Sequence, residues 1–246
     1  MSETVYAIGD VHGQLRRLNW VLDLIEKDGG KDAKIVFVGD YTDRGPDSKG
    51  VLDLLINAKA QGRNWTFLLG NHDEMFSMFM QSPPQHDPHL PTELYWLHPR
   101  LGGDTTMASY GVVSEPTKRL SVTHAEALEA VPQEHVAFLR SLQDTHTHGD
   151  LFFCHAGIRP NVPLAQQTHN DLIWIRQEFH AFTDQHPKII VHGHTPVDEA
   201  THYGNRVNID SGAGYGHELT AAVFEEGRVW KLTDAGRVEL TPLWVG

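Results

Sequence analysis

Short apolar runs alternate with amphipathic stretches along the first part of the chain. The runs at 5–8, 34–38 and 65–69 have the length and the apolar character of buried strands. Between them, leucine and isoleucine recur at helical spacing over 15–25 and 51–56. Alternating strands and helices predict an α/β fold whose parallel strands all end at the same edge of one sheet.

The alternation of strand and helix patterns stops in the middle of the chain. Prolines and histidines interrupt residues 81–131, which predicts an insertion of loops and short helices. We expect this insertion to lie over the site, to be anchored by buried residues such as Trp96, and to supply no catalytic residue.

Strand signals return in the last part of the chain, at 151–154 and 188–191. From Tyr203 onward, glycine-containing turns separate segments that suit antiparallel strands, at 207–209, 221–224 and 229–232. The sequence contains no internal repeat and no linker. The whole chain, residues 1–246, is therefore predicted to form one domain.

Five short polar motifs each follow one of the apolar runs. They are Gly9-Asp10-Val11-His12-Gly13, Gly39-Asp40-Tyr41-Thr42-Asp43-Arg44-Gly45, Gly70-Asn71-His72-Asp73-Glu74, His155-Ala156-Gly157 and His192-Gly193-His194-Thr195. Because α/β sheets bind ligands at the carboxyl ends of their strands, we expect Asp10, Asp40 and Asn71 to converge. Carboxylates, an amide and imidazoles gathered at one edge indicate metal-assisted phosphoryl chemistry.

These residue types suit a pair of divalent cations. Asp10 and His12 are two residues apart and can reach one cation, while the two oxygens of Asp40 can bridge cations about 3.5–4 Å apart. The residues expected to complete the second site are Asn71, His155 and His194. A set without thiolate suits Mn²⁺, Fe or Zn²⁺ rather than Cu(I). The alternative is that the acidic residues only form turns and the histidines are hydrogen-bonded core residues.

The composition of the chain limits the kinds of partner and the compartment that we expect for it. There are 20 Lys and Arg against 32 Asp and Glu, a formal net charge of −12, which disfavours extended binding to nucleic acid. No apolar run approaches the roughly 20 residues of a membrane span, and strand-like sequence by Val5 leaves no room for a signal peptide. With Cys154 as the single cysteine, no intrachain disulfide can form, so we expect a cytoplasmic protein.

In order, the motifs GDVHG, GDYTDRG, GNHDE, HAG and HGHTP resemble those of the phosphoprotein phosphatase family of metallophosphoesterases. The resemblance is strongest to the bacterial and phage-type serine/threonine protein phosphatases. It runs from about residue 5 to 215 and covers 81–131 only loosely. It implies an α/β fold of the calcineurin-like αββα type, with mixed sheets and a dimetal site at the strand carboxyl ends.

The resemblance also assigns metal ligands. It gives the first metal Asp10, His12 and the bridging Asp40. It gives the second metal Asp40, Asn71, His155 and His194.

Four further residues receive roles from the same resemblance. His72, which follows the ligand asparagine, would be the general acid, and Asp43 would hydrogen-bond its ring. Arg44 would bind phosphate, as suits a planar guanidinium. Arg176, in Trp174-Ile175-Arg176, matches a second phosphate-binding arginine, although a surface charge on a helix over 172–179 is the alternative. Tyr215 lies where the family places an aromatic near the site, a contact that we leave open.

The activity implied is that of a serine/threonine protein phosphatase. Two cations, with Mn²⁺ favoured, would lower the pKa of a shared water and give a bridging hydroxide that attacks phosphorus. The substrate of such an enzyme would be a phosphorylated protein or peptide. The sequence indicates neither an oligomeric state nor a preference between phosphoserine or phosphothreonine and phosphotyrosine.

Two other functions compete with this one. The neighbouring symmetrical diadenosine tetraphosphatase branch often lacks the equivalent of Asp43 and departs from the His-Thr-Pro ending. This chain keeps Asp43 and has His194-Thr195-Pro196, which favours the phosphatase. A non-catalytic metal-binding scaffold should have lost a ligand or the acid, and none is missing here.

Overall fold

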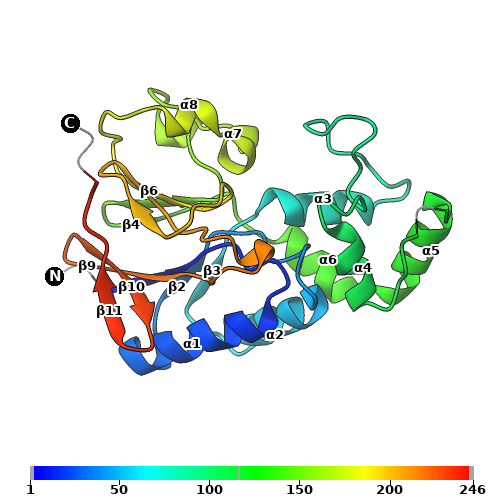
Figure 1. Cartoon of the computed structure of the whole chain (residues 1–246), viewed down its shortest axis with the longest axis horizontal. Helices are drawn as coiled ribbons and strands as arrows, with labels where there is room; N and C mark the ends of the chain where they lie inside the picture. The colour runs from blue at the N-terminus through cyan, green and yellow to red at the C-terminus, as the bar shows by residue number, and fades with distance from the viewer. Residues whose placement is uncertain (1–2, 116, 244–246) are drawn as a thin grey trace.

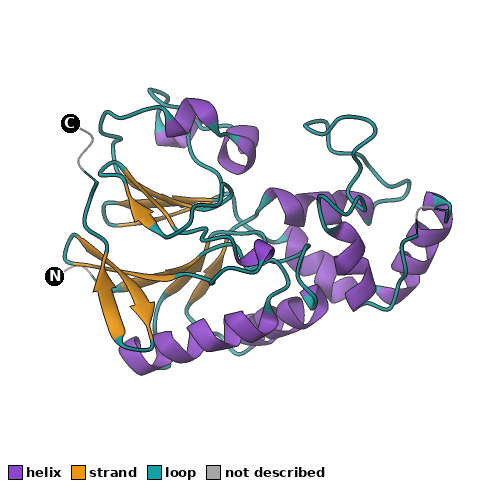
Figure 2. Cartoon of the chain, in the orientation of Figure 1, coloured by secondary structure: helices purple, strands orange, loops and turns teal. Residues whose placement is uncertain are grey.

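The computed structural model describes residues 3–115 and 117–243. Within these residues, two β-sheets pack face to face and helices cover the outer face of each sheet (Figure 1; Figure 2). The first sheet has the strand order β11-β10-β9-β1-β2-β3, and the second has the order β4-β5-β6-β8-β7. The predicted αββα sandwich is confirmed.

Both sheets are mixed. The first contains β1 (Val5–Ile8), β2 (Ile35–Phe37), β3 (Trp65–Phe67), β9 (Ala221–Glu225), β10 (Arg228–Thr233) and β11 (Gly236–Glu239). The second contains β4 (Thr145–His148), β5 (Leu151–Cys154), β6 (Ile189–His192), β7 (Thr201–His202) and β8 (Arg206–Asn208). As predicted, β1, β2 and β3 are parallel, and β9 and β10 are antiparallel.

One strand direction differs from the prediction. The segment at 207–209 was expected to be antiparallel, but β8 pairs in parallel with β6 and is antiparallel only to β7. The reason is that β7 carries the chain back across the sheet, so β8 runs in the same direction as β6.

The helices form two covering layers and one end cluster (Figure 1). The first sheet is covered by α1 (Leu15–Gly29) and α2 (Ser48–Ala60), and the second by α7 (His169–Trp174) and α8 (Gln177–His180). The helices at the end of the sandwich are α3 (Asn71–Phe79), α4 (Gly103–Ser109), α5 (Leu120–Ala130) and α6 (Gln133–Arg140). Short 3₁₀ turns lie at η1 (Leu164–Gln166) and η2 (Ala213–Tyr215). No helix within the described residues is both long and apolar enough to span a bilayer.

Strand alternation builds the core between the sheets. Along β1, Val5 and Ala7 face the second sheet, whereas Tyr6 and Ile8 pack against the helices. Phe153 of the second sheet meets Phe224 of the first edge-on, with ring centroids 6.0 Å apart. This core fixes the two sheets relative to each other, so loops that leave the two sheets can build a single site.

The segment 81–131 contains a long loop followed by α4 and α5. Trp96 ties it to the body of the protein, because its ring stacks on Phe76 of α3 at 5.0 Å and also contacts Phe79. The loop that follows α3 curls back toward α7 in Figure 1. The segment therefore lies beside the strand ends that carry the polar motifs.

Candidate metal centre and phosphate site

The ends of five segments meet at one edge of the sandwich. Asp10 follows β1, Asp40 follows β2, and Asn71 begins α3 shortly after β3. His155 and His194 arrive from the second sheet, after β5 and β6. All five side chains are buried, and direct contacts join them across the sheets. The predicted convergence of Asp10, Asp40 and Asn71 is observed.

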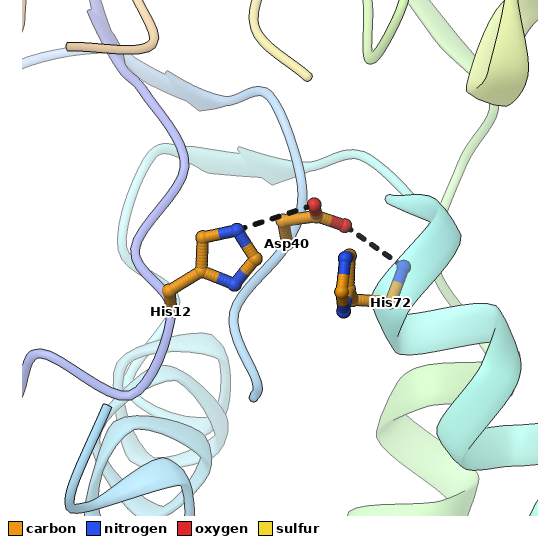
Figure 3. A group of neighbouring side chains, drawn as sticks. All are labelled: His12, Asp40 and His72. Carbon is orange, nitrogen blue, oxygen red and sulfur yellow. Dashed lines mark hydrogen bonds and ion pairs between the residues drawn. The ribbon is translucent and has the colours of Figure 1, made fainter. Parts of the chain in front are cut away.

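One group at this edge consists of His12, Asp40 and His72, whose ligand atoms lie within 4.8 Å of one another (Figure 3). The Nε2 of His12 lies 3.5 Å from Oδ2 of Asp40. Its Nδ1 lies 2.8 Å from the carbonyl of Thr42, to which it donates. The lone pair of Nε2 therefore faces the carboxylate, the tautomer that a metal-binding histidine needs.

A second group consists of Asp40, His155 and His194, again within 4.8 Å. Asn71 joins it, because its Oδ1 lies 3.0 Å from Nε2 of His155 and 2.9 Å from Nδ1 of His194. His155 also lies 3.5 Å from Asp40 through the same Nε2 atom. Asp40 is thus shared by both groups, as a bridging carboxylate would be.

The donor atoms of this second group fit a cation. His155 donates its Nδ1–H to the carbonyl of Val38 at 2.9 Å, which leaves a lone pair on Nε2. That lone pair faces the oxygens of Asn71 and Asp40, so acceptors surround an acceptor. The Nε2 of His194 is buried and has no hydrogen-bond partner among the described residues. A positive ion relieves the crowding at Nε2 of His155, because this nitrogen and the oxygens of Asn71 and Asp40 can each donate a lone pair to it.

Asp10 belongs to neither group. Its Oδ2 accepts a hydrogen bond from the backbone N–H of His194 at 3.0 Å. The close approach depends on Gly193, where a Cβ would clash with the Asp10 carboxylate. The role of Asp10 as a ligand of the first metal stays a prediction.

His72 and Asp43 form a buried pair next to Asp40. The Nδ1–H of His72 donates to Oδ2 of Asp43 at 2.7 Å. The backbone N–H of His72 donates to Oδ1 of Asp40 at 3.0 Å, which holds the start of α3 against the proposed bridge. This is the contact predicted between Asp43 and the imidazole.

Arg44 points into the cluster. Its guanidinium contacts the imidazole of His12 and donates to Nε2 of His72 at 2.9 Å. On its other side, it lies 4.8 Å from the ring centre of Tyr215, a cation–π contact. Tyr215 thus reaches the site through Arg44, while its own side chain stays largely exposed.

Arg176 is exposed. Burial is the main cause that lowers the pKa of His155 and His194, and the charge of Arg176 is close enough to act in the same direction. The predicted helix over 172–179 is wrong, because α7 ends at Trp174 and α8 begins at Gln177. Ile175 and Arg176 have extended and irregular backbone angles, and Ile175 is buried in the core of the second sheet. The break places Arg176 between two helices rather than on a helix surface.

Comparison with known proteins shows to which family the chain belongs. The profile of the calcineurin-like phosphoesterases matches residues 3–224. The chain belongs to the calcineurin-like phosphoesterase family. Enzymes of this family hydrolyse phosphate esters with divalent metals, and the two groups described above could hold such a pair.

The individual relatives of this phosphoesterase share less than a third of its sequence. The chain is 29% identical to a protein of Anoxybacillus flavithermus named asymmetrical bis(5'-nucleosyl)-tetraphosphatase PrpE, over 89% of each chain. A crystal structure described as a "putative diadenosine tetraphosphatase" has a TM-score of 0.65 at 20% identity, covering 100% of this chain and 96% of the other. A cold-active protein-tyrosine phosphatase of Shewanella has a TM-score of 0.59 at 17% identity, covering 98% and 81%. At these identities the two structures show the fold alone.

The electrostatics of this phosphoesterase site favour metal binding. Burial raises the pKa of Asp10 well above its ordinary value, and the carboxylates of Asp210 and Asp40 act in the same direction. Burial lowers the pKa of His12 and His194 well below the ordinary value, so both rings are neutral near pH 7. Burial opposes ionisation of Asp40, and positive charge on the surrounding histidines, with His155 first, is what brings its pKa below the ordinary value. Where those rings are neutral, a bound cation can supply the positive charge that keeps Asp40 ionised. Neutral imidazoles and crowded carboxyl groups are the states that a cation stabilises.

Backbone strain is concentrated in the same place. Among the described residues, seven non-glycine residues have positive φ, and five of them belong to the polar motifs. Those five are His12, Asp40, Asp43, Arg44 and His194. Such conformations cost about 1–3 kcal/mol each and persist only where the surrounding structure imposes them. The sharp turns aim these side chains at one point.

Asp210, which the sequence motifs did not single out, is a buried carboxyl whose negative charge acts on Asp10. Burial raises its pKa to about 6. Its Oδ1 also accepts the N–H of Gly212 at 2.9 Å, which fixes the turn leading to Tyr215. A signal was present, because Asp210 follows an apolar strand segment as the residues of the five motifs do.

The segment 81–131 contributes more to the site than its sequence pattern indicated. Trp96 donates its Nε1–H to Oδ2 of Asp43 at 2.8 Å, and Thr106 donates to Oδ1 at 2.7 Å. Both oxygens of Asp43 are therefore held by the segment 81–131. The insertion thus positions the His72–Asp43 pair.

We expect Asp210→Asn to weaken metal binding by about 10- to 100-fold, because it removes a negative charge next to Asp10. The measurement is the dissociation constant for Mn²⁺ by calorimetric titration. The control is Asp32→Asn, which removes the same charge at an exposed position before β2. Equal dissociation constants for Asp210→Asn and the control would show that Asp210 does not support the centre.

Proposed function

We propose that this chain is a dimetal phosphoesterase that hydrolyses dinucleoside polyphosphates. The observation that carries the substrate class is the similarity, over 89% of both chains, to a relative named asymmetrical bis(5'-nucleosyl)-tetraphosphatase. The buried carboxylates, amide and imidazoles at the strand ends support the metal-dependent part of the proposal.

In this proposal the first metal is held by Asp10, His12 and Asp40. The second metal is held by Asp40, Asn71, His155 and His194. Mn²⁺ is the preferred cation, and Fe or Zn²⁺ would also suit these oxygen and nitrogen donors. When bound, the two cations would supply Lewis acidity toward the phosphoryl oxygens and increase the acidity of a water nucleophile.

The remaining residues handle the proton and the phosphate. His72 transfers a proton to the leaving oxygen, and Asp43 fixes the orientation of its ring through the 2.7 Å hydrogen bond. Arg44 and Arg176 bind the phosphoryl oxygens, where fixed positive charge stabilises the transition state. Arg44 must exchange its contacts with His12 and His72 for substrate oxygens as the site fills.

Asp43 and His194-Thr195-Pro196 do not decide against the nucleotide substrate. They separate the chain from the symmetrical branch only, whereas the named relative is an asymmetrical hydrolase. The second candidate is the serine/threonine protein phosphatase activity implied by the sequence motifs. The intact His72–Asp43 pair favours it, because an alkoxide leaving group needs a proton more than a phosphate leaving group does.

A turnover panel with Mn²⁺ tests the proposed function. It compares diadenosine tetraphosphate, a phosphoserine peptide, a phosphotyrosine peptide and a cyclic-nucleotide diester. We expect diadenosine tetraphosphate to have the highest kcat/KM and to give AMP and ATP. A higher kcat/KM for a phosphopeptide would replace the proposal with the protein phosphatase, and ADP as the single product would assign symmetrical cleavage.

We expect His72→Asn to keep two metals and to lower kcat by about 10²–10⁴ on the phosphoserine peptide, whose leaving group is a strong base. The loss on diadenosine tetraphosphate should be smaller, because a phosphate leaves more readily than an alkoxide. Metal analysis and steady-state kinetics check both parts. The matched control is His148→Asn, at the far end of the second sheet. Loss of one metal in His72→Asn would make His72 a ligand instead of the acid.

A further inference from the structure

A cleft lies next to the two groups of candidate metal ligands. It has a volume of about 580 Å³, and the residues that matter here are His89, Asn170, Trp174 and Arg176. This volume lies in the range of about 300–1,000 Å³ that small-molecule sites occupy. Trp174 forms the boundary with the metal groups, because its ring meets His194 edge-on with centroids 5.9 Å apart.

An aromatic platform lies along this cleft. The imidazole of His89, on the insertion loop, stacks on Trp174 with centroids 4.9 Å apart and an angle of 20°. One face of the His89 ring is therefore covered, while 32% of its side chain remains exposed. An exposed flat ring backed by a second ring is a surface on which another planar group can stack.

A buried carboxyl holds this platform in place. Asp87 is 3% exposed, and its Oδ1 accepts the backbone N–H of His89 at 2.8 Å and lies 2.9 Å from Nδ1 of the ring. The other oxygen, Oδ2, has no hydrogen-bond partner among the described residues. Burying a carboxylate is unfavourable unless it is hydrogen-bonded, and the two contacts of Oδ1 with His89 fix the orientation of the ring.

The cleft also has polar groups suited to a nucleotide. Arg176 lines the cleft and lies near His194, whose pKa its charge helps to lower beside the larger effect of burial. Within the described residues no carboxylate lies within 4.0 Å of its guanidinium, whereas the neighbouring Arg159 pairs with Asp171 and Glu178. The side chain of Asn170 is exposed and makes no hydrogen bond within the part of the chain that the structure describes. These groups match the parts of a nucleotide. The guanidinium of Arg176 suits the phosphates, the stacked rings of His89 and Trp174 suit the flat base, and the amide of Asn170 suits the polar edge of the base.

We propose that this cleft binds one nucleoside of the substrate, with its base stacked on the His89–Trp174 pair and its phosphates running past Arg176 to the metals. The inference rests on the proposed function, since it names the part of a dinucleoside polyphosphate that the cleft recognises. Because Trp174 contacts His194, a base held there lies only a short phosphate chain from the metals. The metals would then act on a phosphate close to the bound nucleoside.

Two probes that resist hydrolysis isolate the contribution of the nucleoside. Adenosine 5'-methylenediphosphonate and the methyl monoester of methylenediphosphonate carry the same phosphonate groups and the same charge, and they differ by the nucleoside. Calorimetric titration of the Mn²⁺-loaded protein gives a dissociation constant for each. We expect the adenosine compound to bind about tenfold more tightly or better, the effect of one base stacked on an aromatic side chain.

Three variants test the platform. His89→Ala should reduce the ratio of the two dissociation constants to near one, whereas His89→Phe, which keeps a flat ring, should retain most of it. His86→Ala is the matched control, an exposed histidine on the same loop that does not line this cleft, and should leave the ratio as in the parent protein. Because the ratio is formed within each variant, any change in metal content affects both probes alike.

A ratio near one in the parent protein would overturn the inference, and so would an unchanged ratio in His89→Ala or a ratio near one in His89→Phe. These results are independent of turnover, so a failure of the proposed function is recognised separately, by absent hydrolysis of diadenosine tetraphosphate. If His89→Ala instead raises KM for a phosphoserine peptide and leaves the probe ratio unchanged, the cleft belongs to a peptide and the inference is wrong.

Discussion

The structure depends on one electrostatic constraint, the crowding of lone-pair donors at the end of the sandwich. Asp40 is shared by two histidine-containing groups, and Asn71 faces two of the imidazoles at hydrogen-bond distance. With neutral rings, several of these contacts join acceptor to acceptor, which is unfavourable in a buried site. Bound cations would replace these unfavourable contacts with bonds between ligand and metal. The local structure is therefore suited to positive charge that the side chains of the site do not supply.

The rest of the molecule keeps those donors in place. Strand ends from both sheets deliver them, and residues with positive φ turn them inward. Gly70 and Gly193 allow the backbone to pass against the carboxylates of Asp40 and Asp10, where any Cβ would clash. The insertion adds a further layer, because Trp96 and Thr106 hold both oxygens of Asp43.

Sequence alone was sufficient for features that depend on local pattern. The parallel strands, their common edge and the convergence of Asp10, Asp40 and Asn71 followed from apolar runs and from the residues after them. It did not reach features set by tertiary contacts, such as the direction of β8, the helix break at Ile175 and the hydrogen bonds from Trp96. Asp210 was missed although it follows a strand segment, because no histidine or arginine stands beside it in the sequence.

The central claim is that Asp40 bridges two cations. The most direct test is anomalous diffraction from crystals of the protein grown with Mn²⁺. We predict two anomalous peaks, one on each side of the Asp40 carboxylate, separated by about 3.5–4 Å as in other two-metal hydrolases. A single peak, or two peaks that do not share Asp40, would contradict the account.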